Sequence, residues 1–311
     1  MKKETFYFDS RDNKSKIYAV RWTPDSENVV GIVQIVHGMA EYVERYEEFA
    51  KYLTEHNFVV VGEDHLGHGK SVGEGDVQGY FCEQDPATVA VRDVHRLKKL
   101  TQELYPGVPY FLVGHSMGSF IVRNYICRYG TGINGAVIMG TGGKAEGLLA
   151  FSRMIASIQG ALQGQKHVSK FLNKAAFGKY NKRIKKARTS FDWLTKEEAV
   201  VDAYMADKDC GFIFTVNGFK TMFEFISRAQ NPDNLAQIPK DLPILVISGE
   251  EDPVGDYGAG VSKAYQALVD AGVRNIKLTL YPDDRHELLN ETDREKVMED
   301  ITGWISKFLV I

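Results

Sequence analysis

Six short apolar runs, separated by segments of helical periodicity, constrain the fold of this 311-residue chain more than any other feature. The runs are rich in valine and isoleucine, which is typical of strands buried on both faces of a sheet. Their alternation with helical segments predicts an α/β fold with a mostly parallel central sheet flanked by helices. Two earlier runs, 5–8 and 16–22, predict an antiparallel hairpin at the start of the chain. The six runs cover residues 29–36, 58–62, 110–113, 136–139, 244–247 and 276–280.

The alternation is interrupted once, between residues 143 and 238. This stretch contains no convincing strand, and prolines at positions 232, 239 and 243 mark the return to the strand and helix pattern. We therefore predict a helical insertion, 143–238, after the sixth strand, in a core formed by residues 1–142 and 239–311. The helices expected in the insertion cover residues 148–162, 168–186, 195–204 and 212–228.

The sequence Gly-His-Ser-Met-Gly at residues 114–118 lies between the run 110–113 and a segment of helical character, 120–128. In this context a G-x-S-x-G pattern predicts a nucleophile elbow, because the glycines allow a tight turn that presents the serine hydroxyl at the carboxyl edge of the sheet. The N-terminus of the following helix would also favour an oxyanion. The alternative is a glycine turn without chemistry. We predict that Ser116 is a nucleophile.

A serine hydroxyl is a weak nucleophile, so it needs a general base that an acid orients. In this topology the chain order is serine, acid and histidine. Only His167 and His286 follow Ser116. His286 lies in the loop after the last run, at the carboxyl end of its strand, whereas His167 lies among lysines in the insertion. We therefore predict His286 as the base.

The acid is expected in the loop after the run 244–247, where Glu-Glu-Asp occupies residues 250–252. The distance from the strand end and the turn imposed by Pro253 favour Asp252, and the two glutamates are assigned to solvent. Aspartates at 283 and 284 stand so close to His286 in sequence that they would have to fold back to reach it. We assign them structural or surface roles.

A tetrahedral intermediate requires two hydrogen-bond donors for its oxyanion. One is expected to be the backbone N–H of Met117, immediately after the serine. The second is expected from the loop after the first long run, where His-Gly-Met-Ala-Glu occupies residues 37–41. We assign it to the backbone N–H of Met39. The alternative for this loop is a turn glycine beside a buried histidine.

Charge and cysteine content exclude several other functions. A net charge of −3, from 38 basic and 41 acidic residues, gives no electrostatic indication of a nucleic-acid partner. Three scattered cysteines offer neither a disulfide framework nor the spacing of a zinc site. The predicted chemistry requires no cofactor and no metal. A polar N-terminus and the lack of a long apolar segment lead us to expect an unprocessed cytoplasmic protein.

Several motifs together resemble one branch of the α/β-hydrolases, the monoglyceride lipases and lysophospholipases. The motifs are residues 37–41 with the following Arg45 and Tyr46, Asp-His-Leu-Gly-His-Gly-Lys-Ser at residues 64–71, the serine motif at 114–118, and the loops of the acid and the histidine. The resemblance extends from about residue 25 to the C-terminus. It is weakest in the insertion, where members of the family differ and where their substrate preference lies.

The resemblance implies a capped serine hydrolase that acts on esters of single-chain acyl lipids, of monoacylglycerol or lysophospholipid type. It also implies a triad of Ser116, Asp252 and His286, with the oxyanion hole at Met39 and Met117. The histidines at 65 and 68 match a structural pattern of the family, so we do not assign them to a metal site. A peptidase or amidase and a thioesterase are alternatives, because the same triad serves each of them. A binding protein without activity is a further alternative.

The insertion holds more apolar residues than short surface helices require. At helical spacing such residues more often pack a core than line a pocket. Some of them must nevertheless face the serine if the insertion covers it. The candidates for the substrate-binding surface are Phe151, Ile155, Phe212, Phe219 and Phe223.

Residues 147–191 contain ten basic side chains and no acidic one, which leaves 28 basic against 41 acidic residues elsewhere. A solvated helix face that aids solubility would explain this pattern. The functional alternative is transient association of the basic cap with an anionic lipid surface, to which each lysine or arginine contributes about 1 kcal/mol before screening. The sequence indicates no oligomeric state.

Overall fold

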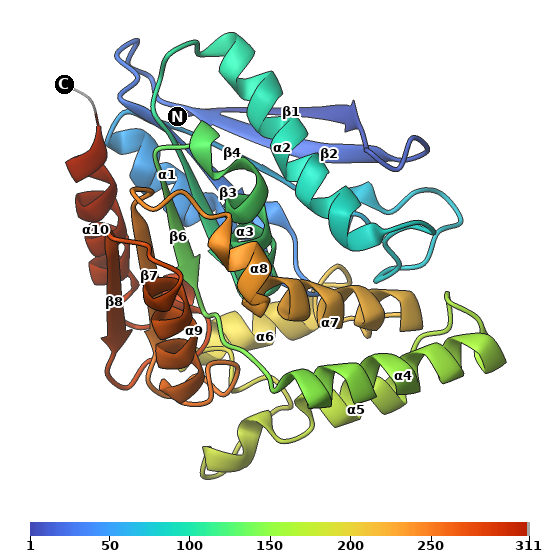
Figure 1. Ribbon diagram of the computed structural model, residues 1–311. Coiled ribbons are helices and arrows are strands. Elements are labelled where there is room, and N and C mark those ends of the chain that lie inside the picture. The colour runs from blue at the N-terminus through green and yellow to red at the C-terminus, as the bar shows by residue number, and fades with distance from the viewer. Residues whose placement is uncertain (310–311) are drawn as a thin grey trace.

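An eight-stranded sheet forms the centre of the computed structural model, which describes residues 1–309 (Figure 1). Across the sheet the strands follow the order β1 (Lys2–Asp9), β2 (Lys16–Thr23), β4 (Phe58–Glu63), β3 (Gly31–Val36), β5 (Tyr110–His115), β6 (Gly135–Met139), β7 (Ile244–Gly249) and β8 (Ile276–Tyr281). The hairpin β1–β2 is antiparallel and pairs antiparallel with β4, and the remaining pairs are parallel. The predicted mostly parallel sheet that opens with a hairpin is therefore confirmed.

Helices cover both faces of the sheet. Helices α1 (Glu47–Glu55) and α10 (Arg294–Ile305) pack on one face, and α2 (Pro86–Leu104), α3 (Met117–Tyr129) and α9 (Ala259–Asp270) pack on the other. A hydrophobic core lies on each face of the sheet. In β5 the side chains of Phe111 and Val113 point to the core beside α1 and α10, whereas those of Tyr110 and Leu112 point to the core beside α2, α3 and α9. Strands buried on both faces explain why the runs are continuously apolar rather than alternating.

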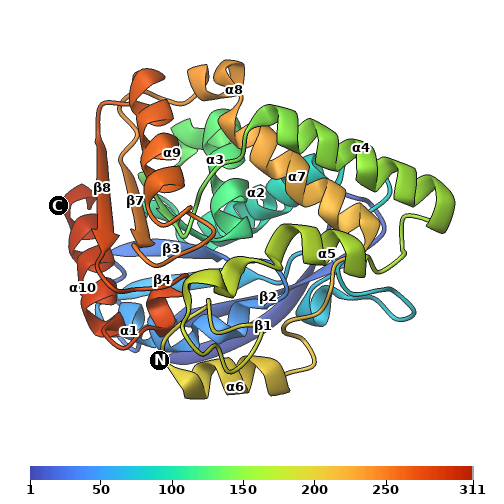
Figure 2. The same cartoon turned by 90° about the horizontal axis from the view of Figure 1, so that it is seen from below.

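The chain between β6 and β7 forms a helical insertion, which we refer to as the cap. It contains α4 (Glu146–Gln163), α5 (Lys170–Phe177), α6 (Glu198–Ala206), α7 (Val216–Gln230) and α8 (Pro232–Ala236). Helix α7 packs against α3 of the core and against α4, so that α4 lies one layer further from the sheet (Figures 1 and 2). No helix within residues 1–309 is long and apolar enough to cross a membrane.

Three of the expected cap helices are shorter than the sequence predicted. The helix expected over 168–186 ends at Phe177, because Gly178 follows it and a separate 3-10 helix begins at Tyr180. The helix expected from 212 begins at Val216, because the Thr215 side chain caps it by accepting the N–H of Gly218 at 3.1 Å. The helix expected over 195–204 begins only at Glu198. Within residues 1–309 the 3-10 helices are η1 (Val43–Tyr46), η2 (Gly69–Ser71), η3 (Gly130–Gly132), η4 (Tyr180–Arg183), η5 (Leu288–Asn290) and η6 (Ser306–Phe308).

Candidate active site

Ser116 occupies a sharp turn between β5 and α3. Its backbone angles, φ 54° and ψ −119°, lie in a region that L-residues rarely adopt. The turn is held by a hydrogen bond from the Ser116 N–H to the Met139 carbonyl at 3.0 Å. A Cβ at Gly118 would lie 1.9 Å from the Val36 carbonyl oxygen, so only glycine fits there. The strand, turn and helix around Ser116 are those that a nucleophile elbow requires.

Asp252 and His286 come from the loops after β7 and β8 and meet at the carboxyl edge of the sheet. The distance between His286 Nδ1 and Asp252 Oδ2 is 2.9 Å, and the two residues are 1% and 0% exposed. Asp252 also accepts hydrogen bonds from Ser248 Oγ at 3.2 Å and from the Val254 N–H at 2.8 Å. Because a carboxylate only accepts, Nδ1 of His286 carries the proton, and Nε2 of the neutral ring is a hydrogen-bond acceptor.

Ser116 and His286 line the same cavity. No hydrogen bond between Ser116 Oγ and His286 is found in the described part of the chain; in free enzymes such catalytic contacts are often long and tighten when substrate binds. The other acids and the other histidine considered in the sequence lie elsewhere. Asp284 is buried, and burial raises its pKa to about 7, but the hydrogen bond of His286 Nδ1 goes to Asp252 and not to Asp284. Asp283 and both glutamates before Asp252 are exposed, and His167 stands between α4 and α5.

The loop that follows β3 passes directly beside the serine. A Cβ at Gly38 would lie 3.1 Å from the Ser116 Cβ and 2.6 Å from Glu41 Oε1, so the close approach requires glycine. The Gly38 N–H donates to Glu41 Oε1 at 2.6 Å. Met39 lines the cavity, and no acceptor for its N–H is found within residues 1–309. Met117 is the first residue of α3, so its N–H has no acceptor within the helix.

A buried group of charges, which the sequence analysis did not assign, supports this loop and the histidine loop together. Arg45 donates to Glu41 at 2.6 Å and to both oxygens of Glu287 at 2.8 Å. His115 Nδ1 lies 3.3 Å from Glu41 Oε1, and His115 Nε2 lies 3.2 Å from the carbonyl oxygen of His286. The spacing of four residues between Glu41 and Arg45 could have indicated their ion pair, but the other partners of both residues are distant in sequence.

The pKa shifts in this group follow from its charge balance. Burial alone would raise the pKa of Glu41, but the hydrogen bond from His115 and the charge of Arg45 hold it well below its usual value. Burial opposes the charged form of Glu287 as well, yet Arg45 lowers its pKa. Burial would lower the pKa of His115, but the hydrogen bond to Glu41 and the charges of both carboxylates raise it. The two carboxylates therefore remain ionised beside the cavity.

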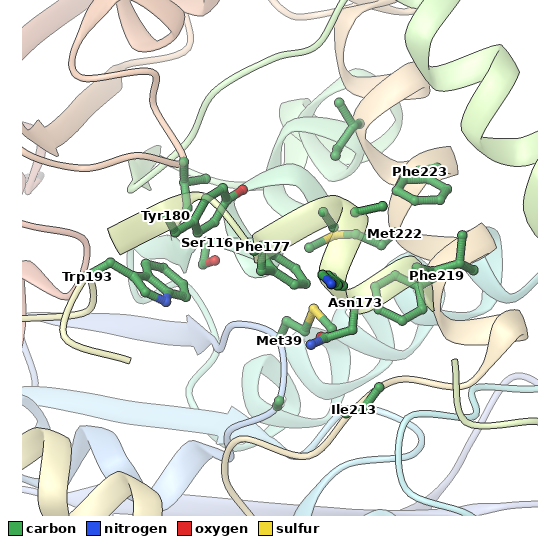
Figure 3. A pocket seen from close by; sticks show the side chains of 18 of the residues that line it. Met39, Ser116, Asn173, Phe177, Tyr180, Trp193, Ile213, Phe219, Met222 and Phe223 are labelled. Atoms are coloured by element: carbon green, nitrogen blue, oxygen red, sulfur yellow. The ribbon is translucent and has the colours of Figure 1, made fainter. Parts of the chain in front are cut away.

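The cavity has a volume of about 760 Å³ and differs at its two ends. Glu41, His115 and Glu287 line it close to the serine, whereas the part under the cap is apolar and aromatic (Figure 3). The Trp193 ring lies 5.1 Å from the His286 ring and 4.9 Å from that of Tyr180. The cavity is lined by all five apolar residues selected from the sequence, which are Phe151, Ile155, Phe212, Phe219 and Phe223. It is also lined by residues that the sequence analysis did not select, among them Asn173, Phe177, Tyr180, Trp193, Ile213 and Met222.

Basic side chains of the cap differ in how they are neutralised. Arg153, Lys166 and Arg188 form ion pairs with acidic residues. Arg183 lies over the ring of Tyr257, with its Cζ 3.4 Å from the ring centre. The other basic residues of the segment 147–191 form no ion pair within residues 1–309. They are Lys170, Lys174, Lys179, Lys182, Arg183, Lys185 and Lys186. In the same range, no group of three or more His, Cys, Asp or Glu side chains could hold a metal ion.

Comparison with known proteins adds to this geometry. Residues 27–293 match the family Hydrolase_4, described as serine aminopeptidase, S33. The monoglyceride lipase homolog of monkeypox virus is 28% identical over 294 residues, which cover 93% of this chain and 94% of that protein. The monoacylglycerol lipase of Mycolicibacterium smegmatis is 27% identical over 289 residues, which cover 93% and 92%. A solved structure of a highly thermostable carboxyl esterase from Bacillus coagulans in complex with glycerol matches the full length of both chains, with a TM-score of 0.92 and 30% identity.

Proposed function

The chain belongs to the Hydrolase_4 family (serine aminopeptidase, S33), and we propose that it hydrolyses carboxylic esters of single-chain acyl lipids through an acyl-enzyme on Ser116. The similarity to monoacylglycerol lipases and to a carboxyl esterase supports an ester substrate. We also propose that residues 143–238 form the cap domain on a core of residues 1–142 and 239–311. The three free cysteines support a reducing, cytoplasmic location.

The proposed reaction has two steps that share one base. Ser116 Oγ attacks the ester carbonyl carbon while His286 Nε2 takes the hydroxyl proton, and Asp252 holds the resulting imidazolium. The backbone N–H groups of Met39 and Met117 stabilise the oxyanion. His286 then protonates the departing alcohol, which leaves the acyl group on Ser116. A water molecule, deprotonated by His286, attacks this ester and releases the acid, and Ser116 regains its proton.

The observation that carries the proposal is the two-ended cavity around Ser116. The apolar part under the cap, with residues such as Phe177, Phe219 and Phe223, suits a hydrocarbon chain. At the end near Ser116, Arg45 pairs with both Glu41 and Glu287, so these groups leave no unpaired cation to bind a phosphate, and their polar atoms suit the hydroxyl groups of a polyol. This contrast favours monoacylglycerols over lysophospholipids. The similar carboxyl esterase from Bacillus coagulans was solved in complex with glycerol, which is a polyol of this kind.

A substrate panel tests the proposal. We expect kcat/KM for a monoacylglycerol to exceed that for a lysophosphatidylcholine of the same chain by about tenfold or more, the ratio that roughly 1.4 kcal/mol produces. Acyl thioesters and peptide anilides, which correspond to the thioesterase and peptidase alternatives, should be poorer substrates. Labelling by a fluorophosphonate should occur in the native protein and not in Ser116→Ala. Faster turnover of peptides than of esters would refute an esterase, and an absence of both turnover and labelling would indicate a binding protein.

A second observation concerns where the substrate is taken up. Helix α4 exposes a stripe of apolar side chains, and seven basic residues nearby in the chain have no acidic partner within residues 1–309. We propose that this side of the cap associates transiently with anionic lipid surfaces, where the apolar stripe contacts the lipid and the lysines contact headgroups. Solubility alone would explain the charges but not the exposed apolar stripe. The exposed apolar residues are Leu148, Phe151, Met154, Ile158 and Leu162 on α4, together with Phe171 on α5.

Sedimentation with vesicles tests this surface. The native protein should bind vesicles that contain phosphatidylserine better than zwitterionic ones, and 0.5 M salt should reduce the difference. Changing Lys179, Lys182, Lys185 and Lys186 to glutamine should remove most of the preference. The same change at four exposed lysines outside the cap should not, although it alters the net charge equally; these are Lys2, Lys51, Lys263 and Lys277. Equal losses in the two variants, or binding that ignores lipid charge and salt, would leave only the solubility explanation.

A further inference from the structure

Three histidines that the proposed reaction does not use are buried beneath the oxyanion loop. His37, His65 and His68 are 0%, 2% and 0% exposed. The ring of His37 lies 4.1 Å from that of His65 and 5.2 Å from that of His68. Most buried ring nitrogens find a hydrogen-bond partner within the protein, although His68 Nε2 is found without a partner within residues 1–309. Their hydrogen bonds therefore show what they hold in place.

The hydrogen bonds of His37 determine its tautomer. The backbone N–H of His65 can only donate, and it lies 3.0 Å from His37 Nε2, so Nε2 is the acceptor. The proton of a neutral ring is then on Nδ1, which lies 2.8 Å from the Gly38 carbonyl oxygen and donates to it. Burial lowers the pKa of His37 to about 4, which is consistent with the neutral ring.

The loop around Gly38 is held at each of its other polar groups. His65 Nε2 lies 3.2 Å from the His37 carbonyl oxygen, which can only accept, so His65 donates there. The Gly38 N–H donates to Glu41 Oε1 at 2.6 Å. His37 itself holds the Gly38 carbonyl. The Met39 N–H, on the opposite side of the same planar peptide from that carbonyl, is the group left without a protein acceptor within residues 1–309.

We propose that His37 is a positioning residue of the oxyanion hole, whose Nδ1–H fixes the Gly38–Met39 peptide so that the Met39 N–H faces the oxyanion. His65 supports this role, because its backbone N–H selects the tautomer of His37. The inference rests on the proposed function, since it takes the Met39 amide as one of the oxyanion donors. A preorganised donor costs no reorientation when the charge develops, which is why its fixed direction matters for kcat.

A pair of amide substitutions separates positioning from simple filling of the interior. In His37→Asn the side-chain NH₂ can take the place of Nδ1–H, whereas in His37→Gln the amide reaches toward the position of Nε2. We expect Asn to keep kcat for a monoacylglycerol within about tenfold of the native value. Gln, and also His37→Leu, should lower kcat by about 10²-fold with KM nearly unchanged, because the donor is lost mainly in the transition state.

Affinity for a trifluoromethyl ketone gives a second readout that packing alone would not move. This ketone forms a tetrahedral oxyanion adduct with the serine, so its affinity should fall in the Gln and Leu variants by the same factor as kcat. The matched control is His68→Phe. His68 belongs to the same buried group, but its Nδ1 lies 3.0 Å from the Leu66 carbonyl, and it makes no hydrogen bond to residues 37–39. This variant should retain both kcat and ketone affinity.

Several outcomes would overturn the inference. Equal kcat values for the Asn and Gln variants, when both unfold near the native melting temperature, would show that the Nδ1 donor is irrelevant. An equal loss in His68→Phe would show that only packing matters. A native protein that turns over no ester would instead refute the proposed function, so the two failures are distinguishable.

Discussion

The floor and the roof of the cavity differ in the interactions that form them. The floor consists of Ser116, Asp252 and His286 with the loop 37–41. Hydrogen bonds of 2.6–3.2 Å hold Glu41, Asp252 and His286, which are at most 3% exposed. The roof, formed by α4 and α5, exposes Phe151 at 57%, Leu162 at 80% and Phe171 at 63%. One region is polar and enclosed, whereas the other is apolar and partly open.

The difference separates the region that positions reacting groups from the region that contacts the apolar part of a substrate. Polar hydrogen bonds are directional, so they fix the floor at the precision that proton transfer demands. Apolar contacts are not directional, and they allow the roof to receive chains that differ in length. Changes in the floor should therefore act on kcat by orders of magnitude, and changes in the roof should act on chain preference by small factors. The following experiments test that division.

The largest effect is expected from the nucleophile and the base. Ser116→Ala or His286→Ala should lower kcat by about 10⁶-fold, because the two groups act as one unit. The measurement is steady-state hydrolysis of a monoacylglycerol, with circular dichroism to verify the fold. Substantial turnover by either variant would remove that residue from the triad.

The acid should have the next largest effect. Asp252→Asn should lower kcat by about 10⁴-fold, because an amide can no longer hold the imidazolium and its reversed hydrogen bond disturbs the tautomer of His286. Asp284→Asn is the matched control. Asp284 is also buried near the histidine loop, but its raised pKa means that a neutral side chain is already tolerated there. A larger loss at Asp284 than at Asp252 would mean that the acid has been misassigned.

An oxyanion donor on the backbone predicts an unusual pattern at Met39. Met39→Ala keeps the N–H and should retain most activity, whereas Met39→Pro removes it and should lower kcat by about 10²–10³-fold. The ratio of the two kcat values is the measurement, with near-native circular dichroism required of both proteins. If the two substitutions behaved alike, the donor would lie elsewhere.

In the roof, bulk rather than chemistry should matter. Ile155 of α4 lines the cavity, whereas Ser157 on the same helix is exposed and lies outside both the cavity lining and the apolar stripe. Ile155→Trp should lower kcat/KM for long-chain esters by about tenfold and leave butyrate esters unaffected, because the larger side chain fills space needed only by long chains. Ser157→Trp should change neither. A uniform loss across chain lengths would show that α4 disturbs the floor rather than the acyl site.

The smallest catalytic effect should come from a buried acid outside both regions. Burial raises the pKa of Asp93 to about 7, above its ordinary 3.8, although Ser10 and the Arg11 N–H donate to it. Between these pH values the unfolded chain releases this proton and the folded chain keeps it, so stability falls as pH rises. Asp93→Asn should therefore flatten the decline in melting temperature between pH 5 and pH 8 while kcat stays the same. Exposed Asp283→Asn should leave the profile steep, and an equally steep profile in Asp93→Asn would refute the assignment.

Topology made much of the site predictable from sequence. Loops that follow parallel strands gather at one edge of the sheet, so the chain order alone indicated that the loop of Asp252 would meet that of His286. The glycines around Ser116 also pointed to the turn that the structure shows. These inferences depended only on local patterns and on a general rule of sheet geometry.

The buried charges could not be predicted in the same way. Arg45 and Glu287 are separated by 242 positions, and nothing local to either indicates that the other neutralises it. The predicted ends of the cap helices were wrong for a related reason. The N-terminal cap of α7 is a single hydrogen bond to the Thr215 side chain, and it outweighs the helical periodicity of Phe212 and its neighbours. Pairings of this kind emerge only when the chain is folded.

The positive φ of Ser116 has a consequence for the order in which the protein fails on heating. A residue in such a region costs about 1–3 kcal/mol, out of the roughly 5–15 kcal/mol by which a folded protein is stable. The turn persists because Met139 and the strand beside Gly118 hold it on both sides. If the ends of β3 and β6 fray on heating, Ser116 is released to an ordinary conformation before the centre of the sheet unfolds. Loss of activity should therefore precede global unfolding, so that the melting temperature overstates the temperature at which the enzyme still works.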